Sequence, residues 1–172
     1  MDKELKIPET SLIFKIENKR PIELIDLTKS LISVSNQFSD YVSKEGNSKE
    51  EREAKLYIKE IKSGSVIIEL IEYATVGMIP FIENVNTIVG FADNLKRAIK
   101  YYLIDEGEKP ETTINDLKDI STILNPVAKD KGSQMFVQTT INGNVELTIN
   151  LNSNDANTVQ NRIKQEITDL KI

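Results

Sequence analysis

The chain has 172 residues, of which 39% are hydrophobic and 28% charged, and its net charge is −5. These values are typical of a folded protein that buries one sizeable core. The sequence contains neither Cys nor His, which excludes disulfides, cysteine–zinc sites and Ser-His-Asp or Cys-His catalysis. A nucleic acid is not expected as a partner, because that affinity depends on clustered Lys and Arg.

The first elements predicted along the chain are a strand at residues 12–17 and a long helix. Pro21 suits the first turn of this helix, which runs to about Ser43. Its apolar residues recur every three or four positions, at Leu24, Leu27, Leu31, Val34, Phe38 and Tyr41. Ile25, Ile32 and Val42 widen this apolar face. We therefore expect the surplus to be buried against a second copy of the chain, as a homo-dimer.

A charged loop at residues 44–53 leads into a predicted β-hairpin. Its second strand, residues 66–71, is apolar at nearly every position, which is typical of a central strand buried on both faces. After Pro80 the pattern predicts a second long helix that ends near Asp105. The stretch 105–112 is the best boundary between two halves, residues 1–105 and 112–172.

The second half begins with Thr113 and Asp116, which predict a capping box at the start of a short helix. Pro126 is expected to stop this helix, and residues 125–133 to form a loop before a second hairpin at residues 136–149. Ser153 is the predicted N-cap of the last helix. The buried stripe of that helix is Ala156, Val159, Ile163, Ile167 and Leu170.

The two hairpins share a pattern of a β-run, a turn closed by glycine (Gly64 and Gly143) and a second β-run, with an Asn-Thr pair beyond each. A three-residue loop with the glycine in the left-handed conformation gives each hairpin one apolar face; it opposes Ile58 to Ile68 in the first hairpin and Thr139 to Val145 in the second. The predicted fold is α+β: an antiparallel sheet packed by long helices, with two αββα-like repeats after an N-terminal strand, in a single composite domain, 1–172. A chance likeness of the hairpins is the alternative to a duplication.

Two sets of polar residues are candidates for a site. The first, Glu60, Glu69, Glu72 and Glu83, has the chemistry to hold Mg²⁺, but a solvated strand face and strand end account for it. The second set lies at two predicted helix starts, where free N–H groups favour anions. Its members are Asn84, Asn86, Thr87, Asn157 and Thr158. Helix capping is the alternative role for this second set. No metal is expected, because a solvated strand face and strand end account for the glutamates, and no cofactor is expected, because no Gly-rich phosphate loop occurs.

The function expected from these observations is that of a non-enzymatic protein-interaction module that works as a homo-oligomer in the cytoplasm. A bacterial or phage origin fits the abundance of Ile, Lys, Asn and Glu. The alternative is a small-ligand or nucleotide-binding protein that uses the helix starts near Asn86 and Asn157; an enzyme that relies on carboxylates ranks third. No membrane segment is assigned, because Glu69, Glu72 and Glu83 interrupt the most apolar stretch.

Overall fold

The computed structural model describes residues 10–45, 56–62, 65–72, 75–76, 79–80 and 87–171. Its elements, in chain order, are β1 (Thr10–Glu17), α1 (Leu24–Glu45), β2 (Leu56–Lys62), β3 (Val66–Glu72), β4 (Thr75–Val76), β5 (Ile79–Pro80), α2 (Thr87–Ile104), α3 (Ile114–Ala128), β6 (Gln134–Ile141), β7 (Asn144–Asn152) and α4 (Ser153–Leu170). Five strands form one antiparallel sheet in the order β2-β3-β1-β6-β7. The α+β class with an antiparallel sheet and long helices is confirmed.

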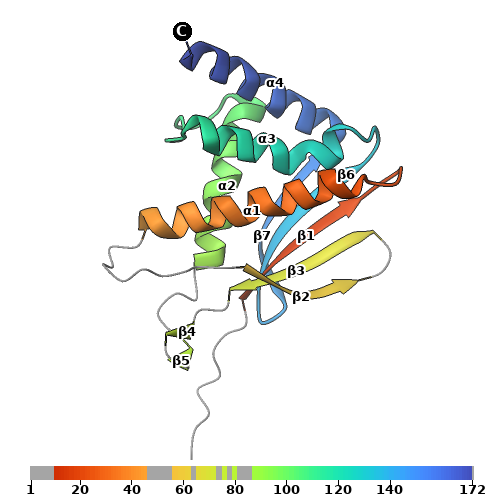
Figure 1. The fold of residues 1–172 in the computed structure, drawn as a ribbon, viewed down its shortest axis with the longest axis vertical. Helices are drawn as coiled ribbons and strands as arrows, with labels where there is room; N and C mark the ends of the chain where they lie inside the picture. The colour runs from red at the N-terminus through yellow and green to blue at the C-terminus, as the bar shows by residue number, and fades with distance from the viewer. Residues whose placement is uncertain are drawn as a thin grey trace, which may run out of the picture.

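The helices lie on one side of the sheet (Figure 1). Alternation along β1 explains why: Leu12, Phe14 and Ile16 are buried, whereas the intervening Ile13 and Lys15 are only half-buried. In the strand order, β1 is the middle strand of the sheet. The expected central strand, β3, is an interior strand that pairs with β2 and β1.

The helix layer is a row of α1, α3 and α4, with α2 crossing it next to the sheet (Figure 1). Ser30 sits where α1 meets α3, and its buried hydroxyl donates to the Ile123 carbonyl at 2.8 Å. Phe38 of α1 meets Phe91 of α2 edge to face, with ring centroids 5.4 Å apart. Because α1 ends the row, it has a neighbouring helix of that row, α3, on one flank only.

The turn between β1 and α1 is held by Asp130, which is buried after the end of α3. Its Oδ2 accepts hydrogen bonds from the backbone N–H groups of Lys19, at 2.7 Å, and Arg20, at 3.1 Å. Lys129 adds an ion pair to Asp26 in the first turn of α1, at 3.0 Å. The start of α1 is therefore fixed beside the end of α3.

The loop predicted for the second hairpin is wrong. Asn142 and Gly143 form a two-residue turn in which both have positive φ, 50° and 81°, the pattern of a type I′ turn. A bulge at Glu146 then shifts the register, so that Thr139 opposes Leu147 instead of Val145. The extra residue places the apolar side chains of both strands on one face of the hairpin. With the two-residue turn alone, apolar and polar side chains would share each face.

The first hairpin carries its bulge on the other strand. Ile58 opposes Leu70 and Glu60 opposes Glu69, which leaves Lys59 of β2 without a partner. The predicted pairing of Ile58 with Ile68 is wrong by two residues, and Gly64 lies outside the described residues. The hairpins also differ in place, because the second strand of one and the first strand of the other flank β1. The repeat is not confirmed.

Two predicted helix ends need correction. Pro126 does not stop α3, which continues to Ala128; a proline in the last turn removes only one hydrogen bond, and its ring is buried. The last helix is capped by Asn152 instead of Ser153. Asn152 accepts from the Asp155 backbone at 2.8 Å and Asp155 accepts from Asn152 at 3.0 Å, a capping box that Ser153 has no acidic partner to form.

Candidate functional site

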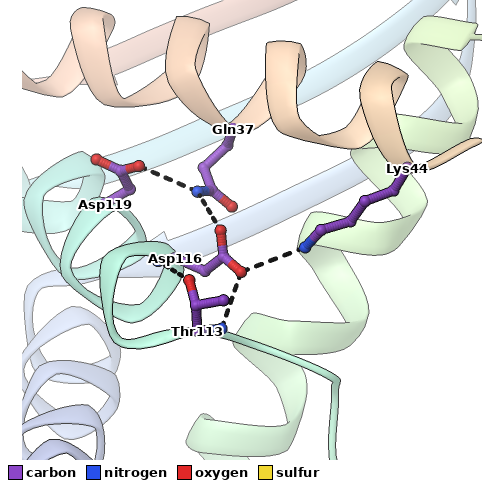
Figure 2. Close-up of polar contacts among 5 residues, drawn as sticks. All are labelled: Gln37, Lys44, Thr113, Asp116 and Asp119. Carbon is purple, nitrogen blue, oxygen red and sulfur yellow. Dashed lines mark hydrogen bonds and ion pairs between the residues drawn. The ribbon is translucent and has the colours of Figure 1, made fainter.

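A polar network joins α1 to the first turn of α3 (Figure 2). At its centre is Asp116, which is only 5% exposed. Its Oδ2 accepts from the Thr113 backbone at 2.9 Å, and its own N–H donates to the Thr113 hydroxyl at 3.1 Å, which confirms the predicted capping box. From α1, Gln37 donates to Asp116 Oδ1 at 3.1 Å, and Lys44 Nζ lies 3.4 Å from Oδ2. All the carboxylate oxygens of Asp116 are therefore engaged.

The surroundings set opposite pKa shifts on two carboxyls. Burial by itself would raise the pKa of Asp116, but hydrogen bonds from Thr113 and Gln37 and the charge of Lys44 outweigh it and hold the pKa below the ordinary value of 3.8. Burial and the nearby Asp116 raise the pKa of Asp40 above that value, against the opposing effect of Lys44. The C-terminal half of α1 thus lies in an excess of negative charge.

The network's chemistry is that of a structural tie. Gln37 bridges the two helices, since its amide also donates to Asp119 Oδ2 at 3.1 Å. Among the described residues no group of three or more acidic side chains is arranged to hold a metal ion. The sequence contained a signal for this contact: Asp116 and Asp119 are three residues apart and Gln37 and Lys44 seven apart, so each pair shares a helix face. The sequence does not show which faces of α1 and α3 meet.

The predicted helix-start residues lie in separate places. Thr87 is the first residue of α2, whereas Asn157 and Thr158 lie in the second turn of α4. Figure 1 shows these two helix starts well apart. The Asn157 amide donates to the carbonyls of Ala128 and Ser153, both at 3.0 Å, and Thr158 donates to the Asn154 carbonyl at 3.0 Å. Asn84 and Asn86 lie outside the described residues, so ligand binding by this set stays a prediction.

The outer face of α1, on the flank away from α3, carries an apolar patch. Leu24 is 78% exposed, Ile25 53% and Ile32 54%. Leu24 was expected within the buried stripe; it is the first residue of α1, beyond the elements that cover the rest of the stripe. Val42, expected to widen the apolar face beyond the buried stripe, belongs to the core. The patch is therefore confined to the N-terminal half of the helix.

The edges of the sheet and its face away from the helices are weaker candidates for a binding surface than the α1 patch. Each edge strand has a bulge at a charged residue, Lys59 in β2 and Glu146 in β7, and both features discourage pairing with another strand. On the open face, the ammonium group of Lys15 lies 5.4 Å from the centroid of the half-buried Phe136 ring. That face mixes charged and apolar residues, so the α1 patch is the more distinct surface.

Comparison of the chain with protein-family models, with curated proteins and with solved structures found no match. Among the helices that the structure describes, none combines the length and the apolar character needed to cross a bilayer.

Proposed function

We propose that this protein is a non-enzymatic interaction module that binds another protein chain through the outer face of α1 and works as a homo-dimer. The observation that carries the proposal is the exposure of Leu24, Ile25 and Ile32 side by side on one helix. Single exposed aliphatic residues are ordinary, but adjacent ones that form a patch mark binding surfaces. Asp116 is the most buried acidic group near this helix, and its carboxylate accepts hydrogen bonds from Thr113 and Gln37, which supports a structural role for it.

The setting proposed for this association is the cytoplasm. The absence of Cys supports it, because secreted proteins of modest size usually depend on disulfides.

The test compares association in variants that leave the monomer intact. Light scattering should show the mass of the wild type rising from 19.5 kDa toward twice that value as concentration increases. Ile25→Lys and Ile32→Lys should remain monomeric at the same concentrations. Because both side chains already face solvent, each change should alter the free energy of unfolding by less than about 0.5 kcal/mol.

Leu170→Lys is the matched control. Leu170 is 51% exposed on α4, so the substitution removes an equally accessible aliphatic side chain far from the patch, and this variant should associate like the wild type. A wild type that stays at 19.5 kDa throughout would refute the homo-dimer. Association that survives both α1 substitutions would show that α1 is not the binding surface.

A further inference from the structure

The turn between β6 and β7 holds the only Asn-Gly pair in the sequence, Asn142 and Gly143. Both residues are exposed. Among the described residues, no atom beyond its chain neighbours comes within 4 Å of a Cβ built at Gly143. Every other Asn is followed by a residue that carries a side chain, as Asn144 is by Val145. The difference is chemical, because the backbone nitrogen that follows an Asn can attack the side-chain amide, and a side chain on that next residue hinders the attack.

We propose that Asn142 is a site of spontaneous deamidation and isomerisation, and that opening of the hairpin end controls its rate. The Gly143 nitrogen attacks Cγ of Asn142, which forms an N–C bond and closes a succinimide ring. The Cγ–Nδ2 bond breaks, and the amide nitrogen leaves as ammonia with the proton that Gly143 gave up. Water then adds to one of the two ring carbonyls. Opening at one carbonyl gives Asp, and opening at the other gives isoaspartate, in which the main chain runs through the side-chain carbon.

The folded turn holds the two reacting atoms apart. The φ angles of Asn142 and Gly143, 50° and 81°, are those of a type I′ turn. This turn type gives its first central residue a ψ of about 30°, the mirror image of the type I value. At that ψ the Gly143 nitrogen points almost opposite to Cβ of Asn142, whereas the ring closes only when that nitrogen lies on the same side as Cβ. The bond between Cα and the carbonyl carbon of Asn142 must therefore rotate, which the closed turn does not allow.

The end of this hairpin is placed where local opening is easiest. In the sheet order, β7 is an edge strand that pairs with β6 alone among the described strands. Val145 and Glu146, which follow the turn, are exposed, so their separation from β6 uncovers little apolar surface. Farther along β6, the buried Thr140 hydroxyl lies 2.7 Å from the hydroxyl of Ser11 on β1. Opening is therefore expected to stop near Thr140 and to free the turn without unfolding the sheet.

The isoaspartyl product should not fit the turn. It lengthens the main chain by one carbon within a two-residue loop, and the length of that loop sets the register of both strands. It also adds a negative charge two residues from the Glu146 bulge, on a chain whose net charge is already −5. The pairing of Ile141 with Asn144 that closes the hairpin is therefore lost. The reaction converts a closed edge hairpin into one whose end stays open.

Incubation of the full chain at mildly alkaline pH tests the proposal, in buffer and in urea above the unfolding transition. Peptide mapping by mass spectrometry locates each deamidated Asn and separates its Asp and isoaspartyl forms. Product should appear at Asn142 well before Asn144, the exposed internal control that precedes Val145. The folded protein should react about tenfold more slowly than the unfolded chain, or slower still, because the hydrogen bonds of the closing pair must break first.

Hydrogen exchange of the aged protein tests the structural consequence. Backbone amides at the start of β7 should exchange faster after ageing in the wild type but not in Asn142→Gly, a variant that keeps a residue suited to positive φ and has no amide to lose. Equal reaction rates with and without urea would overturn control by the turn. Product that forms first at another Asn, or no product at Asn142 in the folded protein, would overturn the site itself. Unchanged exchange in isoaspartyl protein would overturn the opened hairpin.

Discussion

At the scale of single residues, Gly90 allows α2 to lie close to Tyr41 of α1. A Cβ built at Gly90 of α2 would lie 2.3 Å from the hydroxyl oxygen of Tyr41 on α1, well inside van der Waals contact. The Tyr41 ring also packs against Phe91, with centroids 6.1 Å apart, so a movement of its hydroxyl away from α2 would disturb that contact. Glycine here is a packing requirement, which explains its presence in the interior of a helix despite its poor helix propensity.

We predict that Gly90→Ala destabilises the protein even though alanine favours the helix by about 1 kcal/mol, because overpacking costs about 1–3 kcal/mol. Urea unfolding measures the change. Tyr41→Phe provides the matched background, since it removes the clashing oxygen: in that background the same alanine substitution should cost less. An equal cost in both backgrounds would show that the hydroxyl is not the source of the strain.

Residue patterns in the sequence predicted some local features and missed others for a definite reason. The capping box of Thr113 and Asp116 was readable because both partners lie within one turn. The positive φ of Gly143 was also predicted and is confirmed. The bulge at Glu146 was not readable, because a two-residue turn plus a bulge and a longer loop give the same apolar face. Only the residue pairing between β6 and β7 distinguishes the turn with a bulge from the longer loop.

At the scale of elements, α1 and α3 meet through buried polar groups as well as apolar ones, and Asp116 serves both its own helix and the contact. The amphipathic patterns of both helices were evident in the sequence. Their mutual contact was not, because Gln37 and Asp116 are 79 residues apart and each looks like an ordinary surface residue in isolation. The exposure of Leu24 was missed for a related reason. Periodicity shows which face of a helix is apolar, but it does not show how far along the helix other elements pack on that face.

We predict that Asp116→Asn lowers the free energy of unfolding by about 2 kcal/mol near neutral pH, since an amide cannot accept every hydrogen bond that the carboxylate receives. The pKa of Asp116 is lowered in the folded state, so its contribution is complete above about pH 3.8 and is lost as pH falls through the folded value. Urea unfolding near pH 7 and near pH 3 should therefore show the gap between wild type and variant narrowing in acid.

The matched control for this prediction is Asp119→Asn, which removes a second carboxylate that Gln37 contacts but leaves the capping box intact. It should cost less than Asp116→Asn, about 1 kcal/mol, the typical net contribution of one side-chain hydrogen bond. A gap for Asp116→Asn that stays constant between the two pH values would show that its ionised form is not what stabilises the start of α3.

At the scale of the whole molecule, the boundary predicted at residues 105–112 does not separate two independent sheets. β1 pairs with β3 from the first half and with β6 from the second, and α1 packs on α3. Lys109, within the boundary stretch, forms an ion pair with Glu166 of α4 at 2.5 Å, and across the boundary Arg162 donates to the Leu103 carbonyl at 3.1 Å. Each half alone would expose the apolar face that the other covers.

We therefore predict that the chain unfolds as one cooperative unit, and that neither 1–105 nor 112–172 folds when expressed alone. All five Tyr lie in the first half, at positions 41–102, and there is no Trp, so tyrosine fluorescence reports the first half alone. A Phe136→Trp substitution at the half-buried position on β6 reports the second half. The urea midpoints from the two signals should coincide, because loss of either half removes a neighbour of β1. Two separated transitions would show two domains and contradict the single composite domain.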